Sequence, residues 1–424
     1  MLKTVPFWID QVPRPADLPV SSALPAQVDV AIVGGGYTGL NAARVLAQHH
    51  TSVAVLERHT IGWGASSRNG GMTTTGLKLG ATELFSQYGD RLGHAFWQAA
   101  LDSIDLIGEI VADEGIECDF RRNGHIEVAY KPAHFAAMAK HVAWYKEKLN
   151  HTVHVVSQAD LPSELGTQAF YGGLVDEFSA GLHPAKYVFG LARVASRHGA
   201  QLCEETAVTK IEQQPRGFAL HTSKGVIQAK EVVLATNGYT DSLIPKVKRR
   251  VFPVGSYIIV TELLSPALQR ELSPKGRMFF DSKNFLNYFR LTPDGRFLWG
   301  GRNDLSTDLD LHESAKRLQA QMVATFPQLR GIPITHSWTG QLGLTFDLMP
   351  HIGRVNGVHY AFGYGGHGVS IATYLGTEMG KLLCGEKTSS PFAEIKHQTM
   401  PFYHNRPWFI PFAAMYYRFL DRIM

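Results

Sequence analysis

The chain has 424 residues, of which 45% are hydrophobic, enough to build the core of two or three ordinary domains or of one large interleaved pair. Its formal net charge is only +4 and its charges are scattered, which argues against a protein that binds nucleic acid. The 3 cysteines lie far apart without metal-ligand spacing, and no signal peptide is visible, so we expect a cytoplasmic protein with no bound metal.

Residues 28–57 have the pattern of a β-α-β unit. A strand, a helix and a second strand are expected, at 28–33, 40–48 and 52–56. The turn between the first strand and the helix has the G-x-G-x-x-G spacing of dinucleotide-binding proteins, and the residues expected to bind the cofactor there are Gly34, Gly36, Tyr37, Thr38 and Gly39. This unit predicts a Rossmann-type nucleotide-binding domain within an α/β fold.

Each part of this unit has a physical task. Gly34 allows the tight turn, Gly36 lets the backbone approach a pyrophosphate, and Gly39 lets the helix pack closely on the strand. The helix N-terminus offers free N–H groups and a partial positive charge to the pyrophosphate. Glu57, at the end of the second strand, is placed to accept hydrogen bonds from an adenosine ribose.

The stretch after Glu57 favours FAD over other dinucleotides. It is a loop rich in glycine and serine, which could wrap a large ligand with backbone and hydroxyl groups, although an ordinary solvent loop is the alternative. An NAD enzyme would normally continue into another crossover helix. Arg68 and Asn69 are expected to face the isoalloxazine. The full set of cofactor-binding residues expected in this stretch is Arg58, Gly64, Ala65, Ser66, Ser67, Arg68, Asn69, Gly70 and Gly71.

These motifs resemble those of the D-amino-acid-oxidase/glycine-oxidase superfamily of flavoenzymes, and within it they most resemble the gamma-glutamylputrescine oxidoreductases. The similar stretches cover nearly the whole chain, at 33–39, 62–71, 338–354, 363–369 and 411–417. The resemblance implies a glutathione-reductase-like FAD-binding domain interleaved with an α+β substrate domain that has a large mixed β-sheet. It also implies that the backbone at Ala207 and Val208 lies beside the adenine of FAD. The turn at Thr236, Asn237 and Gly238 is expected to bring the chain back to the nucleotide-binding sheet.

The remaining elements are expected in the following order. Residues 1–27 should form an arm over the surface. Helices are expected at 82–114, 132–149, 183–198, 311–326 and 369–384. Strands are expected at 124–130, 206–212, 217–222, 226–229, 231–239 (ending in a small polar turn), 251–261, 284–291, 296–300, 332–338 and 357–363. We expect the FAD-binding domain to comprise 1–80, 151–249 and 350–385, the substrate domain 81–150 and 250–349, and an aromatic tail or helix 386–424.

A glycine-rich turn precedes the helix at 369–384. Its backbone donors and the helix dipole are suited to stabilising negative charge at flavin N1 and C2=O. The cofactor-binding residues expected around this turn are Gly340, Gly365, Gly366, His367, Gly368 and Val369. Within the helix, small residues recur at Ala372, Gly376 and Gly380, and we expect them to pack closely on the sheet, because Glu378 and Lys381 interrupt any membrane-dimer face.

The predicted reaction is oxidation of a C–N bond in a gamma-glutamylputrescine-like or other polyamine derivative, by hydride transfer to flavin N5 and hydrolysis of the imine to an aldehyde and an amine or ammonia. Glycine and D-amino acid oxidases place an arginine, which binds the substrate carboxylate, shortly before a P-x-I-G stretch. In this chain that stretch is 350–353, and the residues before it, 341–346, contain no Arg or Lys. Arg290 or Arg302 could supply such a clamp from another direction, which would favour oxidation of D-amino acids or N-methyl amino acids.

Other candidate catalytic residues have open roles. His367 could tune the protonation of the amine. Aromatic side chains could form a cage around the amine or simply pack in the core, at Tyr257, Tyr288 and Trp338. Some members of the superfamily that this chain resembles bind FAD covalently, through a His in the loop after the second strand or a Cys before the P-x-I-G stretch. Here 66–72 contain no His and 335–353 no Cys, so the resemblance implies non-covalent FAD. Because 296–302 lack the lysine that some amine oxidases use to activate oxygen, the acceptor could be O2 or another compound.

The aromatic tail could touch a membrane surface, but we expect it to dock on its own domain or on a partner subunit of a homo-oligomer. A third hypothesis is a flavin-fold interaction protein without turnover. Flavin bleaching by an amine would distinguish both enzyme hypotheses from it.

Overall fold

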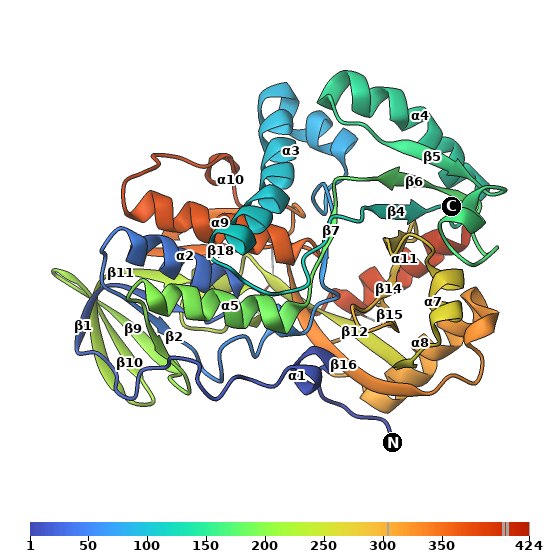
Figure 1. Ribbon diagram of the computed structural model, residues 1–424. Coiled ribbons are helices and arrows are strands. Elements are labelled where there is room, and N and C mark those ends of the chain that lie inside the picture. Colours follow the sequence, from blue (N-terminus) through green and yellow to red (C-terminus); the bar gives the residue numbers. More distant parts are fainter. Residues whose placement is uncertain (303–304, 401–402, 404–406, 424) are drawn as a thin grey trace.

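The computed structural model describes residues 1–302, 305–400, 403 and 407–423, and it contains two eight-stranded sheets with helices packed on them (Figure 1). The first sheet has the strand order β17-β18-β11-β1-β2-β8, and β10 and β9 extend it from β11. β1 pairs in parallel with both β2 and β11, as a Rossmann-type domain requires. The strands are β1 (Gln27–Val33), β2 (Val53–Leu56), β8 (Gln201–Cys203), β9 (Val208–Gln214), β10 (Gly217–Thr222), β11 (Gly225–Leu234), β17 (His351–Val355) and β18 (Val358–Phe362).

Side chains of β1 alternate between two apolar clusters, because successive residues of a strand point to opposite faces. Val30 and Ile32 pack in the cluster that contains the helices, whereas Ala31 and Val33 pack with residues of β10 and β11. The helices on the first of these faces are α2 (Tyr37–Gln48), α5 (Pro184–Arg197) and α9 (Gly368–Leu383). The first sheet is therefore covered on both faces.

The second sheet has the order β16-β12-β15-β14-β13-β4-β6-β5. It is mixed, because β4 and β13 pair in parallel and the other neighbours are antiparallel. One face packs on α8 (Leu311–Thr325) through a cluster rich in Phe and Trp. The strands are β4 (His125–Val128), β5 (His154–Ser157), β6 (Gly172–Asp176), β12 (Phe252–Leu263), β13 (Met278–Asp281), β14 (Asn287–Leu291), β15 (Arg296–Gly301) and β16 (Ile334–Leu344).

The expected fold class is confirmed: a Rossmann-type sheet and a large mixed sheet are built from interleaved segments of one chain. The strand pairing differs from the expected division at residue 150, because β5 and β6 follow that residue and pair in the second sheet. Both are short, so they gave no clear sequence signal. The strands expected at 226–229 and 231–239 form one continuous strand, β11, which ends at Leu234 before the turn at Asn237–Tyr239.

The remaining elements connect and cover the sheets. They are α1 (Phe7–Gln11), α3 (Ala81–Asp113), α4 (Pro132–Leu149), α6 (Pro245–Lys248), α7 (Pro266–Leu272), α10 (Pro391–Glu394), α11 (Ile410–Ile423), β3 (Met72–Thr73) and β7 (Ala180–Gly181). α3 follows the expected helix, but it is kinked at Gly89, where φ is +72°. No helix among the described residues is both long and apolar enough to cross a bilayer.

The N-terminal segment is more than a surface arm. It contains α1, whose Trp8 is fully buried, and the Trp8 indole Nε1 donates a hydrogen bond to the Asn69 carbonyl at 2.8 Å. Trp8 also lies edge-on to His183, at the start of α5. The segment therefore supports the loop that is expected to face the flavin.

The C-terminal helix α11 lies against its own chain. Ile410 and Ala414 are buried beside β12, and the Asp421 carboxylate accepts hydrogen bonds from the backbone N–H groups of Asn284 and Phe285. Its other face exposes large apolar side chains, at Phe412, Met415, Tyr416, Phe419 and Ile423. Contact of this face with a partner subunit or a membrane surface stays a prediction.

The small-residue stripe of α9 makes the expected close contact, but with a different partner. A Cβ added to Gly376 would lie 2.4 Å from the Thr38 carbonyl oxygen, and one added to Gly380 would lie 2.6 Å from Val45 Cβ. Both neighbours belong to α2, so the stripe packs helix against helix rather than helix against sheet. The missing side chains let α9 press α2 onto β1.

We predict that Gly376→Ala lowers the free energy of unfolding by about 1–3 kcal/mol, because the added methyl group forces α2 and α9 apart. Gly108→Ala, within α3, is the matched control: its Cβ would have no neighbour nearer than 3.4 Å, so only the gain in helix propensity remains. Urea unfolding measures both variants. Equal behaviour of the two would contradict the close-packing interpretation.

Candidate functional site

A cavity of about 870 Å³ lies between the two sheets and is lined by residues of both. Its size is that of a pocket for a small molecule or cofactor. Most of the expected cofactor-binding residues line it: Gly34, Gly36, Tyr37, Thr38, Glu57, Arg58, Gly64, Ala65, Ser66, Arg68, Asn69, Gly70, Val208, Thr236, Asn237, Gly238, Gly340, Gly365, Gly366, His367, Gly368 and Val369. The expected residues that do not line it are Gly39, Ser67, Gly71 and Ala207.

The N-terminus of α2 opens directly into this cavity. No side chain caps Gly36 at the start of the helix, and the Tyr37 N–H donates to Ser66 Oγ at 3.0 Å. Gly39 lies one turn below, where an added Cβ would be only 2.0 Å from the Gly34 carbonyl oxygen. Helix and strand therefore meet closely enough for the free N–H groups and the helix dipole to face an anion in the cavity.

Glu57 lies beside this helix terminus, at the end of β2. Its carboxylate accepts hydrogen bonds from the backbone N–H groups of Gly35 at 2.8 Å and His59 at 2.9 Å, which fix its orientation. A carboxylate can accept about four hydrogen bonds, so capacity remains for ribose hydroxyls. An anion-binding helix terminus and an acceptor next to it fit the pyrophosphate and ribose of FAD.

Hydrogen bonds hold the distant cofactor segments together. Thr38 Oγ1 and the Tyr364 hydroxyl are 2.7 Å apart, which ties α2 to the glycine turn before α9. The Asn237 side-chain oxygen accepts from the Gly363 N–H at 3.0 Å, which adds the end of β11. The Arg68 guanidinium donates to the Thr339 carbonyl at 3.2 Å, so the loop after β2 is joined to β16.

Three of the candidate catalytic residues line the cavity and three do not. The lining ones are Tyr288, Arg302 and His367. Tyr257 is instead buried in the core against α8, and its hydroxyl donates to the Ser306 carbonyl at 3.1 Å. Trp338 is buried, and its Nε1 donates to the Arg68 carbonyl at 2.9 Å. It therefore supports the loop at 58–71, which is expected to face the flavin and is called the flavin loop below. Neither aromatic ring walls the cavity.

Arg290 does not reach the cavity either, and therefore supplies no carboxylate clamp there. Its buried guanidinium donates to the carbonyl oxygens of Gly71, Leu182 and Leu291. Burial lowers the pKa of Arg290 to about 10. Arg302, on the segment after β15, does line the cavity and has no hydrogen-bond or ion-pair partner among the described residues. Of the two arginines, only Arg302 is placed to meet a ligand.

Burial and charge fix the protonation of the central cavity residues. The pKa of Tyr288 is raised to about 12 by burial, so its hydroxyl, 3.0 Å from Ser256 Oγ, stays protonated at neutral pH. Burial and the nearby Lys78 lower the pKa of His367 to about 3, so its imidazole is neutral. Burial and Arg302 lower the pKa of Lys78 to about 8. At neutral pH, Lys78 and Arg302 are therefore both positively charged.

Two cavity residues with shifted pKa values, Lys78 and Glu127, were not predicted from the sequence. Lys78 follows the flavin loop, and Glu127 lies on β4 at the other end of the cavity. Burial, followed by the charge of Asp281, raises the pKa of Glu127 to about 7. The alternation His125-Ile126-Glu127-Val128 was a usable signal, because it places both polar side chains on one face of a strand. Only the sheet order shows that this face borders the cavity.

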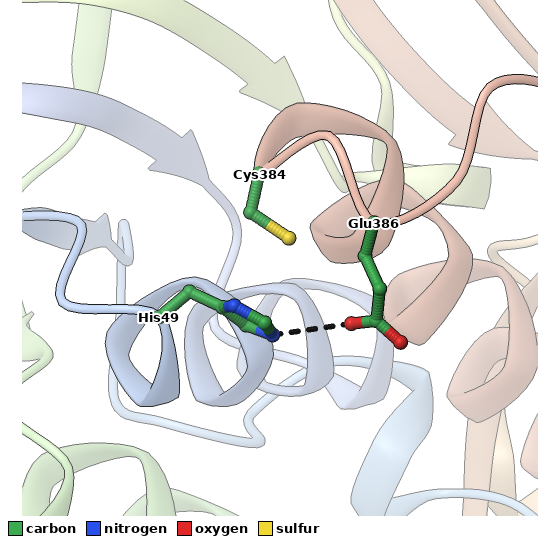
Figure 2. Close-up of side chains that lie close together, drawn as sticks. All are labelled: His49, Cys384 and Glu386. Carbon is green, nitrogen blue, oxygen red and sulfur yellow. Dashed lines mark hydrogen bonds and ion pairs between the residues drawn. The ribbon is translucent and has the colours of Figure 1, made fainter.

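A group of possible metal ligands lies outside the cavity, at the C-terminal ends of α2 and α9. Figure 2 shows His49, Cys384 and Glu386 there, with His49 Nε2 3.1 Å from a Glu386 carboxylate oxygen. Lys381 also pairs with this carboxylate, at 3.3 Å. His49 and Glu386 are exposed, so the group is accounted for as surface ion pairs.

We predict that Glu127→Gln raises the unfolding temperature at pH 8 and leaves it unchanged at pH 4.5. The pKa of Glu127 lies above its ordinary value of 4.5 in the folded protein, so between pH 4.5 and about 7 the unfolded chain loses a proton that the folded chain keeps. Glu127 therefore lowers stability as the pH rises through this range. Thermal unfolding measures the effect, Glu109→Gln on the exposed side of α3 is the control, and a pH-independent difference would contradict the prediction.

Comparison with known proteins supports the same cofactor. The chain matches the family described as "DAO: FAD dependent oxidoreductase" over residues 29–382. It is 33% identical to gamma-glutamylputrescine oxidoreductase of Escherichia coli over 93% of each chain, and 31% identical to the probable oxidoreductase OrdL of Haemophilus influenzae over 93% of this chain and 92% of that one. The crystal structure of glycine oxidase from Geobacillus kaustophilus shares the fold, with a TM-score of 0.73, 24% identity, and coverage of 88% of this chain and 100% of that one. The chain therefore belongs to the DAO family of FAD-dependent oxidoreductases.

Proposed function

We propose that the protein oxidises a C–N bond of an amine of the gamma-glutamylputrescine type. The observation that carries the proposal is the single cavity that joins the α2 N-terminus to Tyr288 and Glu127 of the second sheet. The similarity to gamma-glutamylputrescine oxidoreductase supports this substrate, as does the absence of Arg and Lys at 341–346. In the reaction, the C–H bond next to nitrogen breaks, its electron pair leaves as hydride, and the nitrogen lone pair completes a C=N bond.

FAD, when bound, supplies the acceptor for this hydride. The residues proposed to hold it are the α2 terminus and Glu57 for the pyrophosphate and ribose, and the segments at 64–71 and 365–369 for the ring. We further propose that FAD is dissociable, because no cysteine lies on the cavity lining and 66–72 contain no histidine. Water hydrolyses the imine to an aldehyde and an amine or ammonia.

Lys78 and Arg302 prepare the amine for this reaction. Only a neutral amine has the free lone pair that C=N formation needs. Two positive charges without ion-pair partners among the described residues disfavour a third charge nearby, which lowers the pKa of the bound ammonium. The same two charges, with the N-terminus of α9, stabilise negative charge that develops in the cavity. No strong protein base is required.

We predict that gamma-glutamylputrescine reduces the FAD-loaded protein under anaerobic conditions faster than putrescine, glycine, sarcosine or D-alanine. Stopped-flow absorbance of the flavin band gives the rate and the apparent affinity for each compound. Peroxide release on admission of air then shows whether O2 is the acceptor. Absence of bleaching with every compound would contradict enzymatic oxidation of amines.

The position of Arg302 favours a second candidate, oxidation of D-amino acids or N-methyl amino acids, because its guanidinium could bind a substrate carboxylate. Under this candidate, we expect Arg302→Gln to slow flavin reduction by D-alanine or sarcosine about 100-fold or more. Reduction by amines without a carboxylate would change much less. Arg249→Gln, an exposed arginine that does not line the cavity, is the control.

A further inference from the structure

Acidic side chains line the end of the cavity that is remote from the glycine turn at 34–39. Three carboxylates line it, and two of them are already paired: Asp176 accepts from Thr75 Oγ1 at 2.6 Å and lies 2.7 Å from His151 Nε2, and Asp281 lies 2.8 Å from Lys283 Nζ. These two are accounted for by the fold. They leave one carboxylate to explain.

Glu127 is that carboxylate. Within the described part of the chain its side chain makes no hydrogen bond and no ion pair, although it is half-buried on the cavity lining, where burial raises its pKa to about 7. An unpaired acid held in such surroundings lowers stability, because its charged form is poorly solvated. A second polar group nearby also has no partner: the indole N–H of Trp97, a residue only 4% exposed that lines the same cavity. Two unsatisfied polar side chains at one end of a cavity indicate a missing ligand.

The strand register gives the distance from this end to the flavin loop. Glu127 lies opposite Phe280, and Phe280 lies opposite Tyr288, so the three side chains form a row on one face of the sheet. Tyr288 marks the loop end of the row, because an added Cβ on Gly70 would be 3.0 Å from its ring. Two strand spacings separate Tyr288 from Glu127, which is about 10 Å.

We propose that Glu127 binds a distal ammonium group of an elongated amine substrate, whose reactive carbon lies near Tyr288. An extended chain advances about 1.2 Å per bond, so a span of about 10 Å corresponds to about eight bonds. In gamma-glutamylputrescine, about nine bonds separate the carbon beside the terminal amine from the α-ammonium nitrogen, which is a comparable length. Phe280 lies between the two ends and offers an apolar surface to the methylene groups. This inference rests on the proposed function and adds to it the residue that selects the substrate.

Charge separates the two ends of the cavity. Lys78 and Arg302 repel an ammonium at the reactive end, whereas Glu127 attracts one at the far end, where Asp281 is already paired with Lys283 and Asp176 with His151. Gamma-glutamylputrescine has an α-carboxylate beside its distal ammonium, and N-glutarylputrescine keeps a carboxylate at that end, so comparing the two compounds isolates the ammonium. Attraction of this ammonium by Glu127 favours one orientation, in which the terminal nitrogen loses its proton and the α-nitrogen keeps it.

The test compares two ligands that differ by one group: gamma-glutamylputrescine and N-glutarylputrescine, which lacks the α-ammonium. Titration calorimetry is carried out anaerobically with FAD-loaded protein whose flavin has been chemically reduced, so that binding is measured without turnover. We expect the wild-type protein to bind gamma-glutamylputrescine about 10- to 100-fold more tightly than N-glutarylputrescine. In Glu127→Gln this preference should fall to about twofold or less, while Glu109→Gln should keep it.

Equal affinities of the wild-type protein for the two ligands, binding of neither, or equal weakening of both by Glu127→Gln would overturn the inference. Thermal unfolding of Glu127→Gln confirms that the variant is folded. Failure of the proposed function has a different signature, because gamma-glutamylputrescine would then not reduce the oxidised wild-type protein, whatever the calorimetry shows.

Discussion

The close packing of α2 between β1 and α9 is the constraint on which the site depends. Gly39 brings the helix onto the Gly34 carbonyl, and Gly376 brings α9 onto the Thr38 carbonyl, both at distances that no side chain would permit. The helix is thereby fixed along its length, and its uncapped N-terminus is directed into the cavity. Every further contact of the site, from the Thr38–Tyr364 hydrogen bond to the position of the α9 glycine turn, builds on that placement.

The sequence predicted the features that depend on neighbours along the chain. The β-α-β unit and its glycine turn are local, so their pattern was sufficient to locate them. Features that depend on strand register could not be predicted from the sequence. Arg290 and Arg302 lie on adjacent segments, yet the Arg290 guanidinium binds backbone carbonyls whereas Arg302 lines the cavity. Glu127 was missed for the same reason, and Trp8 was missed because two adjacent buried aromatics, Phe7 and Trp8, in a proline-rich segment show no periodicity.

The cavity combines two electrostatic environments within one enclosure. Lys78, Arg302 and the start of α9 place positive charge in one part of the cavity, which suits an anionic group, whereas Glu127 places a carboxylate without an ion-pair partner among the described residues in another part. His367 and Tyr288 also line the cavity, and they carry no charge at neutral pH because the imidazole is deprotonated and the hydroxyl stays protonated. Such a gradient orients a long polar molecule along its axis, and it does so without a carboxylate clamp in the segment before the P-x-I-G stretch.

The interleaving of the two sheets also has a consequence for how the chain folds. The second sheet is assembled from two separate stretches, 125–176 and 252–344, and strands of the first sheet precede, separate and follow them. Several strand pairs of each sheet are hairpins, but both sheets also depend on long-range pairs, because β1 joins β11 only when Gln27 meets Gln228 and β4 joins β13 only when His125 meets Met278. High contact order of this kind makes folding slow and strongly cooperative. The chain therefore offers no point at which it could be cut into two independently folding halves.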